Sequence, residues 1–227
     1  MAGRSAAKYR PELRTPQNVQ TLLRAGTCES RAPFCAERNR APYELILVDR
    51  KKGEHQSADY LALNPNGRIP TLVDGDLTLF EAAAICLHLA DRHPEAGLIA
   101  APGSRERALT YQWLTFLTNT VQVDFWQYYR PEFYVPPQDE PAYRERMEEH
   151  LLRHLTVLDA ALQGRSALAG ERVSIADLYL LLLGRWCRLL STPTRSFPDL
   201  ARHLDTLVER PAIQRSFAAE SITAPFF

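Results

Sequence analysis

Residues 64–92, NPNGRIPTLVDGDLTLFEAAAICLHLADR, carry the signal of a β-hairpin followed by the signal of a helix. The run RIPTLVDGDLTLF predicts the hairpin, with Asp74-Gly75 at its turn. Pro70 stands at the start of the first strand, where a missing N–H costs least. Residues 81–92 are dense in Ala and Leu, which favours a helix. The stretch therefore predicts two antiparallel strands that lead directly into a helix.

The residues before this stretch predict further strands and a short helix. YELILVD at residues 43–49 is rich in apolar and β-branched residues and predicts a strand. VQTLL at residues 19–23 is a weaker strand candidate, and ADYLALNPNG begins as a short helix. The first half of the chain thus alternates strands and helices, which is typical of an α/β domain.

Beyond residue 92 the pattern changes. HPEAGLIAAPGS, residues 93–104, contains two prolines and two glycines, and we place a domain boundary there. All strong signals after it are helical, and the run at residues 174–190 is so apolar that we expect a buried central helix. The predicted helices cover residues 104–129, 141–162, 174–190, 198–209 and 211–219.

Composition limits the classes of function. Lys+Arg and Asp+Glu both count 27, so no net charge favours nucleic acid or an anionic membrane as a partner. No apolar run is long enough for a transmembrane helix, no export signal is visible, and we expect a cytoplasmic protein with reduced thiols. The four cysteines form no metal-binding spacing, and His150 and His154 lack the Glu of HExxH. We expect no metal and interpret the two histidines as part of a solvated helix face.

Four segments resemble the glutathione S-transferase family, most closely its bacterial beta class. NPNGRIPTL at residues 64–72 is similar to the family's NPxGxIPxL segment, and the residues after it resemble its strand 4, helix 3 and linker. LAGERVSIADLYLLLLGRW resembles its GxxxSxAD segment, and FPDLARHLDTLVERPAIQRSFAAE its C-terminal helices. The resemblance implies an α/β thioredoxin-like N-terminal domain, an all-α helical C-terminal domain and a homodimer. The expected division is a disordered extension at 1–17, a glutathione-binding domain at 18–93, a linker at 94–103 and a helical domain at 104–227.

The resemblance also implies a site for glutathione, which would serve as a co-substrate. A cis bond between Ile69 and Pro70 would leave the Ile69 main chain free to pair with the tripeptide. Glu81 would bind the γ-glutamyl ammonium, and the first amides of the next helix, beginning at Ala82, would bind the carboxylate. Ala82 replaces the family's usual Ser, which predicts weaker binding. Lys52 is matched to the glycine carboxylate, although a solvated basic loop is an equal alternative.

Cys28 is the candidate for the residue that activates the glutathione sulfur. It follows the first strand, where helix-start amides favour a thiolate. Thr27 and Ser30 are hydroxyl alternatives nearby. A buried structural cysteine is a further alternative for Cys28, and it is the preferred interpretation of Cys35, Cys86 and Cys187. Residues 29–40 depart from the family pattern in register, for which an altered reading frame or ordinary divergence can account.

In the helical domain, aromatic residues predict the wall of a pocket for a small apolar electrophile, with core packing as an equal alternative. The pocket candidates are Gln122, Trp126, Tyr129 and Trp186. Ser174 and Asp177 are expected to cap their helix. The leading hypothesis is a glutathione transferase. Thiol–disulfide exchange through Cys28, or a non-catalytic binding or assembly protein on the same fold, are its alternatives.

Overall fold

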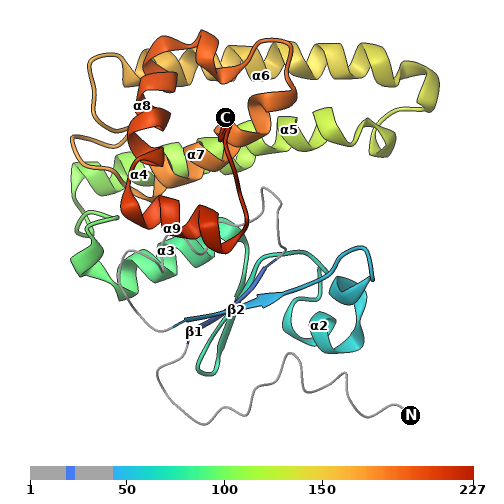
Figure 1. Cartoon of the computed structure of the whole chain (residues 1–227), viewed down its shortest axis with the longest axis vertical. Coiled ribbons are helices and arrows are strands. Elements are labelled where there is room, and N and C mark those ends of the chain that lie inside the picture. Colours follow the sequence, from blue (N-terminus) through green and yellow to red (C-terminus); the bar gives the residue numbers. More distant parts are fainter. Residues whose placement is uncertain (1–18, 24–42) are drawn as a thin grey trace. The chain divides into compact units, whose positions relative to one another are not determined.

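The computed structural model describes residues 19–23 and 43–227 (Figure 1). The chain divides into two compact units, one of residues 1–96 with 215–222 and the other of residues 97–214 with 223–227. Cys28, Cys35 and the irregular stretch at residues 29–40 lie outside the described residues, so the predictions for them stay predictions.

The first unit contains a mixed four-stranded sheet in the order β2-β1-β3-β4. β1 runs parallel to β2 and antiparallel to β3, which in turn is antiparallel to β4. The predicted strands are all present, although the second ends at residue 47 rather than 49. The strands are β1 (Val19–Leu23), β2 (Tyr43–Leu47), β3 (Thr71–Asp74) and β4 (Leu77–Phe80).

The predicted hairpin is present, but its turn lies one residue later than the sequence suggested. Asp74 pairs with Leu77, so Asp74 is the last residue of β3 and the turn consists of Gly75 and Asp76. Gly75 has a φ of 63°, a conformation that glycine adopts without steric cost.

Two helices accompany the sheet. α2 (Ala58–Leu63) precedes the hairpin, and α3 (Ala82–Arg92) follows β4 directly and packs against β3 and β4. The helix predicted at residues 81–92 is therefore confirmed. The Asp74 carboxylate lies 2.8 Å from the ring of His88, which joins the hairpin end to α3.

The second unit is helical, as predicted. The single helix expected at residues 104–129 contains a π-helical turn, Leu117–Val121, between α4 and α5. α9 (Pro211–Ala219) crosses the division between the two units. The other helices are α4 (Arg105–Phe116), α5 (Gln122–Tyr129), α6 (Glu140–Leu162), α7 (Ile175–Trp186) and α8 (Pro198–Val208).

α7 forms the centre of the helical unit. All its residues from Ile175 to Arg185 are buried, which confirms the buried helix expected from its apolar sequence. It packs against α4 and α8 (Figure 1). A Cβ at Gly184 would lie 2.6 Å from a methyl carbon of Leu204, so the absence of a side chain permits the close approach of α7 and α8.

Candidate functional site

The register of the hairpin brings two predicted glutathione contacts to the same end of it. Thr71, the first residue of β3, pairs with Phe80, the last residue of β4. Pro70 and Glu81 are the next residues outward on the two strands. The segment around Ile69 and the start of α3 therefore meet at one end of the hairpin, although they are a dozen residues apart in sequence.

Ile69 combines an anchored side chain with an available main chain. The bond between Ile69 and Pro70 is cis, as the resemblance implies. The Ile69 side chain packs against the buried residues Val48 and Tyr60. Within the described part of the chain, the Ile69 amide and carbonyl make no hydrogen bond. Their donor and acceptor are thus available to an extended peptide, in the manner of an added strand.

Glu81 has an unusual backbone conformation at the start of α3. Its φ of 72° and ψ of 114° lie in a region that non-glycine residues rarely occupy. Such conformations cost about 1–3 kcal/mol and collect at ligand sites. The exposed Glu81 side chain makes no capping hydrogen bond. It is therefore available to a cation, while the amides at the start of α3, from Ala82 onward, lack partners within the helix and attract an anion.

Lys52 lies in the turn after β2. Its ammonium is 3.4 Å from the carboxylate of Asp49, which also accepts hydrogen bonds from the amides of Lys51 and Lys52. The Lys52 side chain is 76% exposed. Exposed ion pairs of this kind contribute little to stability, so the Lys52 ammonium can readily change partner. Its prediction as a partner of the glycine carboxylate stays a prediction.

Two cysteines have the structural character that the sequence suggested. Cys86 and Cys187 are buried at 4% and 0% exposure. Burial raises the pKa of the Cys187 thiol to about 12, so it is a neutral thiol at physiological pH. Among the described residues, no group of three or more His, Cys, Asp or Glu side chains is placed to hold a metal ion.

The structure brings together two of the four predicted pocket residues, Tyr129 and Trp186. Their rings lie 6.3 Å apart, and the Tyr129 hydroxyl donates a hydrogen bond to the Trp186 carbonyl. Both rings also pack against Phe125, which is fully buried. This cluster has the edge-to-face and stacked geometry of aromatic packing within the helical unit.

The other two predicted pocket residues have different neighbours. Trp126 stacks on Phe133 with an interplanar angle of 8° and a centroid distance of 6.5 Å. Gln122 accepts a hydrogen bond from the hydroxyl of Tyr179 on α7. The side chains of Gln122 and Trp126 are partly exposed, and their role in an electrophile pocket stays a prediction.

The prediction of a solvated helix face is wrong for His154 and holds in part for His150. The His154 ring nitrogen lies 2.9 Å from the Asp124 carboxylate on α5, and the His150 ring nitrogen lies 3.7 Å from the same oxygen. The reason is that α6 packs against α5 with the face that bears these residues. The His154 side chain is 18% exposed and joins the two helices, whereas that of His150 is 35% exposed and makes no hydrogen bond to Asp124.

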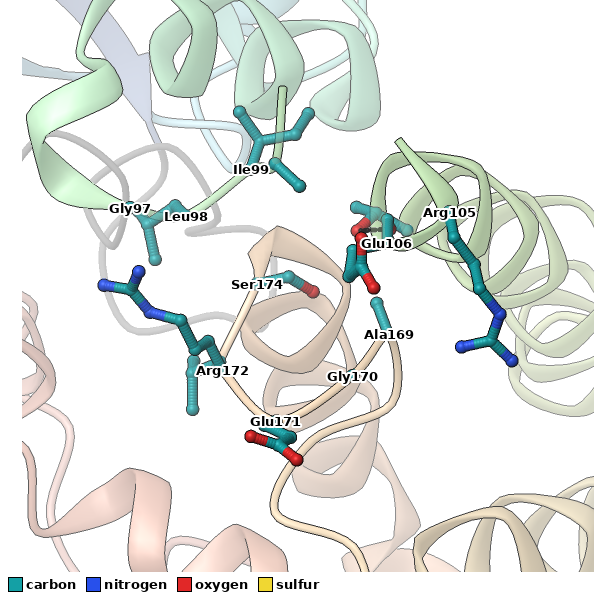
Figure 2. Close-up of a pocket in the computed structure, with 13 residues that line it drawn as sticks. Gly97, Leu98, Ile99, Arg105, Glu106, Ala169, Gly170, Glu171, Arg172 and Ser174 are labelled. Carbon is teal, nitrogen blue, oxygen red and sulfur yellow. Dashed lines mark hydrogen bonds between the residues drawn. The ribbon is translucent and has the colours of Figure 1, made fainter. Parts of the chain in front are cut away.

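A cavity of about 450 Å³ lies within the helical unit, between the linker, the start of α4 and the loop before α7 (Figure 2). Figure 2 shows Glu106 and Ser174 on its inner side, while the side chain of Arg105 points away. The charged residues of its rim are exposed to solvent, and none of the predicted site residues is among those that line it.

Three residues near Ile69 were not predicted as part of the site. Tyr60, Asn64 and Thr71 are buried and form hydrogen bonds around the main chain on both sides of Ile69-Pro70. Asn64 lies in the NPNG motif that the sequence singled out. Tyr60 gives no comparable signal, because a tyrosine in a short amphipathic helix predicts core packing.

Comparison with known proteins identifies relatives of both units. The family model of the glutathione S-transferase N-terminal domain matches residues 29–91, and that of the C-terminal domain matches residues 124–211. The glutathione S-transferase GstA of Escherichia coli O157:H7 is 29% identical over 206 residues, which cover 90% of this chain and 100% of that protein. The probable glutathione S-transferase GSTF2 of Oryza sativa subsp. japonica is 35% identical over 185 residues, which cover 77% of this chain and 84% of that protein.

Solved structures agree with these sequence matches. The glutathione transferase URE2P8 from Phanerochaete chrysosporium, solved with oxidized glutathione, matches with a TM-score of 0.82 at 26% identity. The match covers 92% of this chain and 97% of that one. It confirms the predicted thioredoxin-like domain followed by a helical domain. In the described part of the chain, no helix has the length and apolar character needed to span a membrane.

Proposed function

Because this chain belongs to the glutathione S-transferase family, we propose that its first unit binds glutathione and that its reaction joins the glutathione sulfur to small electrophiles. The protein is a glutathione transferase, and glutathione is its co-substrate. The finer assignments are the residues that hold each end of the tripeptide, the electrophile and the assembly of the chain.

Each end of glutathione has a matching group in the first unit. The Ile69 amide and carbonyl pair with the cysteinyl main chain, as one added strand residue. The Glu81 carboxylate binds the γ-glutamyl ammonium, while the amides at the start of α3 bind the γ-glutamyl carboxylate. The Lys52 ammonium binds the glycine carboxylate at the other end. The tripeptide is thereby oriented before reaction, which removes much of the entropic barrier to a bimolecular step.

In the chemical step the glutathione thiolate forms a carbon–sulfur bond with the electrophile, whose leaving group departs with its bonding electron pair. A donor beside the sulfur stabilises the thiolate, and Cys28 is the candidate for it. In this proposal the electrophile lies against Trp126, Tyr129 and Trp186 of the helical unit, with Gln122 as a polar neighbour. We place the enzyme in the cytoplasm as a homodimer, in keeping with the family resemblance.

The observation that carries this proposal is the hairpin register. The Ile69 main chain, which has no hydrogen bond among the described residues, and the start of α3 lie at one end of the same hairpin. Retention on immobilised glutathione, followed by conjugation of 1-chloro-2,4-dinitrobenzene, tests it. Binding with conjugation supports the transferase. Binding with disulfide reduction but no conjugation, or no binding, contradicts it.

Glu81→Gln tests the assignment of the ammonium partner. Loss of a charge-assisted hydrogen bond at an exposed position weakens glutathione binding about tenfold. Isothermal titration with glutathione measures this change. Glu145→Gln makes the same change at an exposed position on α6 and serves as the matched control. Equal dissociation constants for the two variants would contradict the assignment.

A further inference from the structure

We infer that Tyr60, together with Asn64 and Thr71, is a positioning residue for glutathione, because it fixes the main chain on both sides of Ile69. The inference rests on the proposed function and extends it to residues that do not touch the tripeptide. It begins from the Ile69 main chain, which makes no hydrogen bond within the described part of the chain. The orientation of that amide and carbonyl must therefore be set by the neighbouring residues.

The residue before Ile69 is held by two donors. The Tyr60 hydroxyl donates to the Arg68 carbonyl at 2.6 Å, and the Asn64 side-chain amide donates to the same oxygen at 2.7 Å. Both donors are buried, at 0% and 1% exposure. A carbonyl that accepts two short bonds from buried side chains has little freedom to rotate, so the peptide unit between Arg68 and Ile69 is fixed.

The residue after Pro70 belongs to the same network. The Thr71 hydroxyl lies 2.9 Å from the Tyr60 oxygen, and the Asn64 amide donates to it at 3.4 Å. The Tyr60 proton is already directed to the Arg68 carbonyl, which can only accept. The Thr71 hydroxyl therefore donates to the Tyr60 oxygen, and the two flanks of Ile69-Pro70 are connected through one tyrosine hydroxyl.

Packing and the preceding turn support this network. The Tyr60 ring belongs to the core cluster against which the Ile69 side chain packs. The remaining Asn64 oxygen accepts the Asn66 amide at 3.1 Å, which shapes the turn before Arg68. At Gly67, with a φ of 58°, a Cβ would lie 2.3 Å from the Gln56 side-chain nitrogen and 3.1 Å from the His55 carbonyl, so a side chain there would require the neighbouring residues to shift.

Tyr60→Phe tests the inference, because it keeps the ring in the core and removes the hydroxyl alone. We expect the KM for glutathione to rise about three- to tenfold, in proportion to one buried hydrogen bond. We expect kcat and the KM for 1-chloro-2,4-dinitrobenzene to stay within about twofold. A purely structural role would lower Tm or the active fraction and leave the KM for glutathione unchanged.

Tyr143→Phe is the matched control. It removes a tyrosine hydroxyl that donates to Gln127 within the helical unit, and we expect no change in the KM for glutathione. Thr71→Val is a second variant that removes the hydroxyl on the other flank. It leaves both donors to the Arg68 carbonyl in place, so we expect a smaller rise, about twofold.

The outcomes separate the inference from the proposed function. If the unaltered protein does not bind glutathione, both are overturned. If it binds and conjugates, while Tyr60→Phe folds with an unchanged KM for glutathione, the inference alone is overturned. Should Tyr60→Phe melt below the assay temperature, Thr71→Val decides: a rise in the KM for glutathione supports the positioning role, and an unchanged KM overturns it.

Discussion

At the scale of single residues, similar side chains have different roles because their surroundings differ. Glu81 is exposed on a strained backbone and makes no capping bond, so its charge is available to a ligand. Asp177 is fully buried, and its carboxylate accepts hydrogen bonds from amides within the fold. Burial likewise makes the Cys187 thiol unreactive, because a desolvated thiol resists ionisation.

Cys187 gives a prediction that depends on pH. Burial, the largest cause, raises its pKa from 9.0 to about 12 in the folded protein. Since the folded pKa exceeds that of the unfolded chain, the contribution of this thiol to stability is full below pH 9 and is lost as the pH rises through 12. At pH 8 we therefore expect Cys187 in the native protein to resist iodoacetamide, while the protein unfolded in guanidinium is labelled fully.

Mass spectrometry of the alkylated peptides measures the labelling of Cys187. Cys86, which is buried on α3, provides an internal comparison in the other unit. Labelling of Cys187 at the same rate in the native and the unfolded protein would contradict the prediction.

At the scale of elements, the start of α7 is held by several buried side-chain hydrogen bonds. Ser174 and Asp177 form the capping box that the sequence predicted. Asp177 also accepts the Leu168 amide at 2.9 Å and lies 3.0 Å from the ring of His203, which is 2% exposed. The same carboxylate thus connects the start of α7 to the loop before it and to α8.

Asp177→Ala should therefore cost more than the loss of a cap. We expect the free energy of unfolding to fall by about 3 kcal/mol, because the substitution leaves the buried amides of Leu168 and Ser174 without their acceptor and removes a carboxylate in contact with the buried His203 ring. Ser174→Ala, which removes only the hydroxyl of the cap, should cost about 1 kcal/mol. Urea denaturation measures both values. Equal losses for the two variants would show that the hydrogen bond to Leu168 and the contact with His203 contribute nothing to stability.

At the scale of the whole molecule, equal numbers of acidic and basic residues leave no general field to attract a charged tripeptide. Recognition then depends on local groups at one end of the β3–β4 hairpin. In the proposed arrangement the first unit supplies these groups, while the helical unit supplies apolar surface for the electrophile. The two tasks have different chemistry, which agrees with their separation between two compact units.

Binding of glutathione should stabilise the folded chain by mass action. At a concentration one hundred times Kd the gain is about 2.7 kcal/mol, which raises Tm by about 5–10 °C for a chain of this size. Differential scanning fluorimetry measures the shift. Cysteinylglycine, which lacks the γ-glutamyl group that Glu81 and the start of α3 would bind, should shift Tm far less. A Tm shift of the same size with both peptides would contradict the assignment of Glu81 and the start of α3 to the γ-glutamyl group.

Local patterns determined most of the fold before any tertiary contact was known. The hairpin, the helix at residues 81–92 and the apolar α7 follow from turn chemistry, propensity and periodicity, which act over a few residues. The family was identified by the motif at residues 64–72 together with the other segments that resemble it, which follow in the family's order. The capping box at Ser174 and Asp177 is equally local and was predicted from its spacing.

Tertiary structure decided the features that depend on residues distant in sequence. The sequence pattern predicted an exposed His154, whereas in the structure α6 packs on α5 and the His154 ring contacts Asp124. No local signal marks Tyr60 as a partner of Arg68 and Thr71, because that bonding exists only once the fold brings the Tyr60 hydroxyl to the start of β3. Sequence specifies which groups are present, whereas their distances and burial, which set hydrogen bonding and pKa, arise from packing.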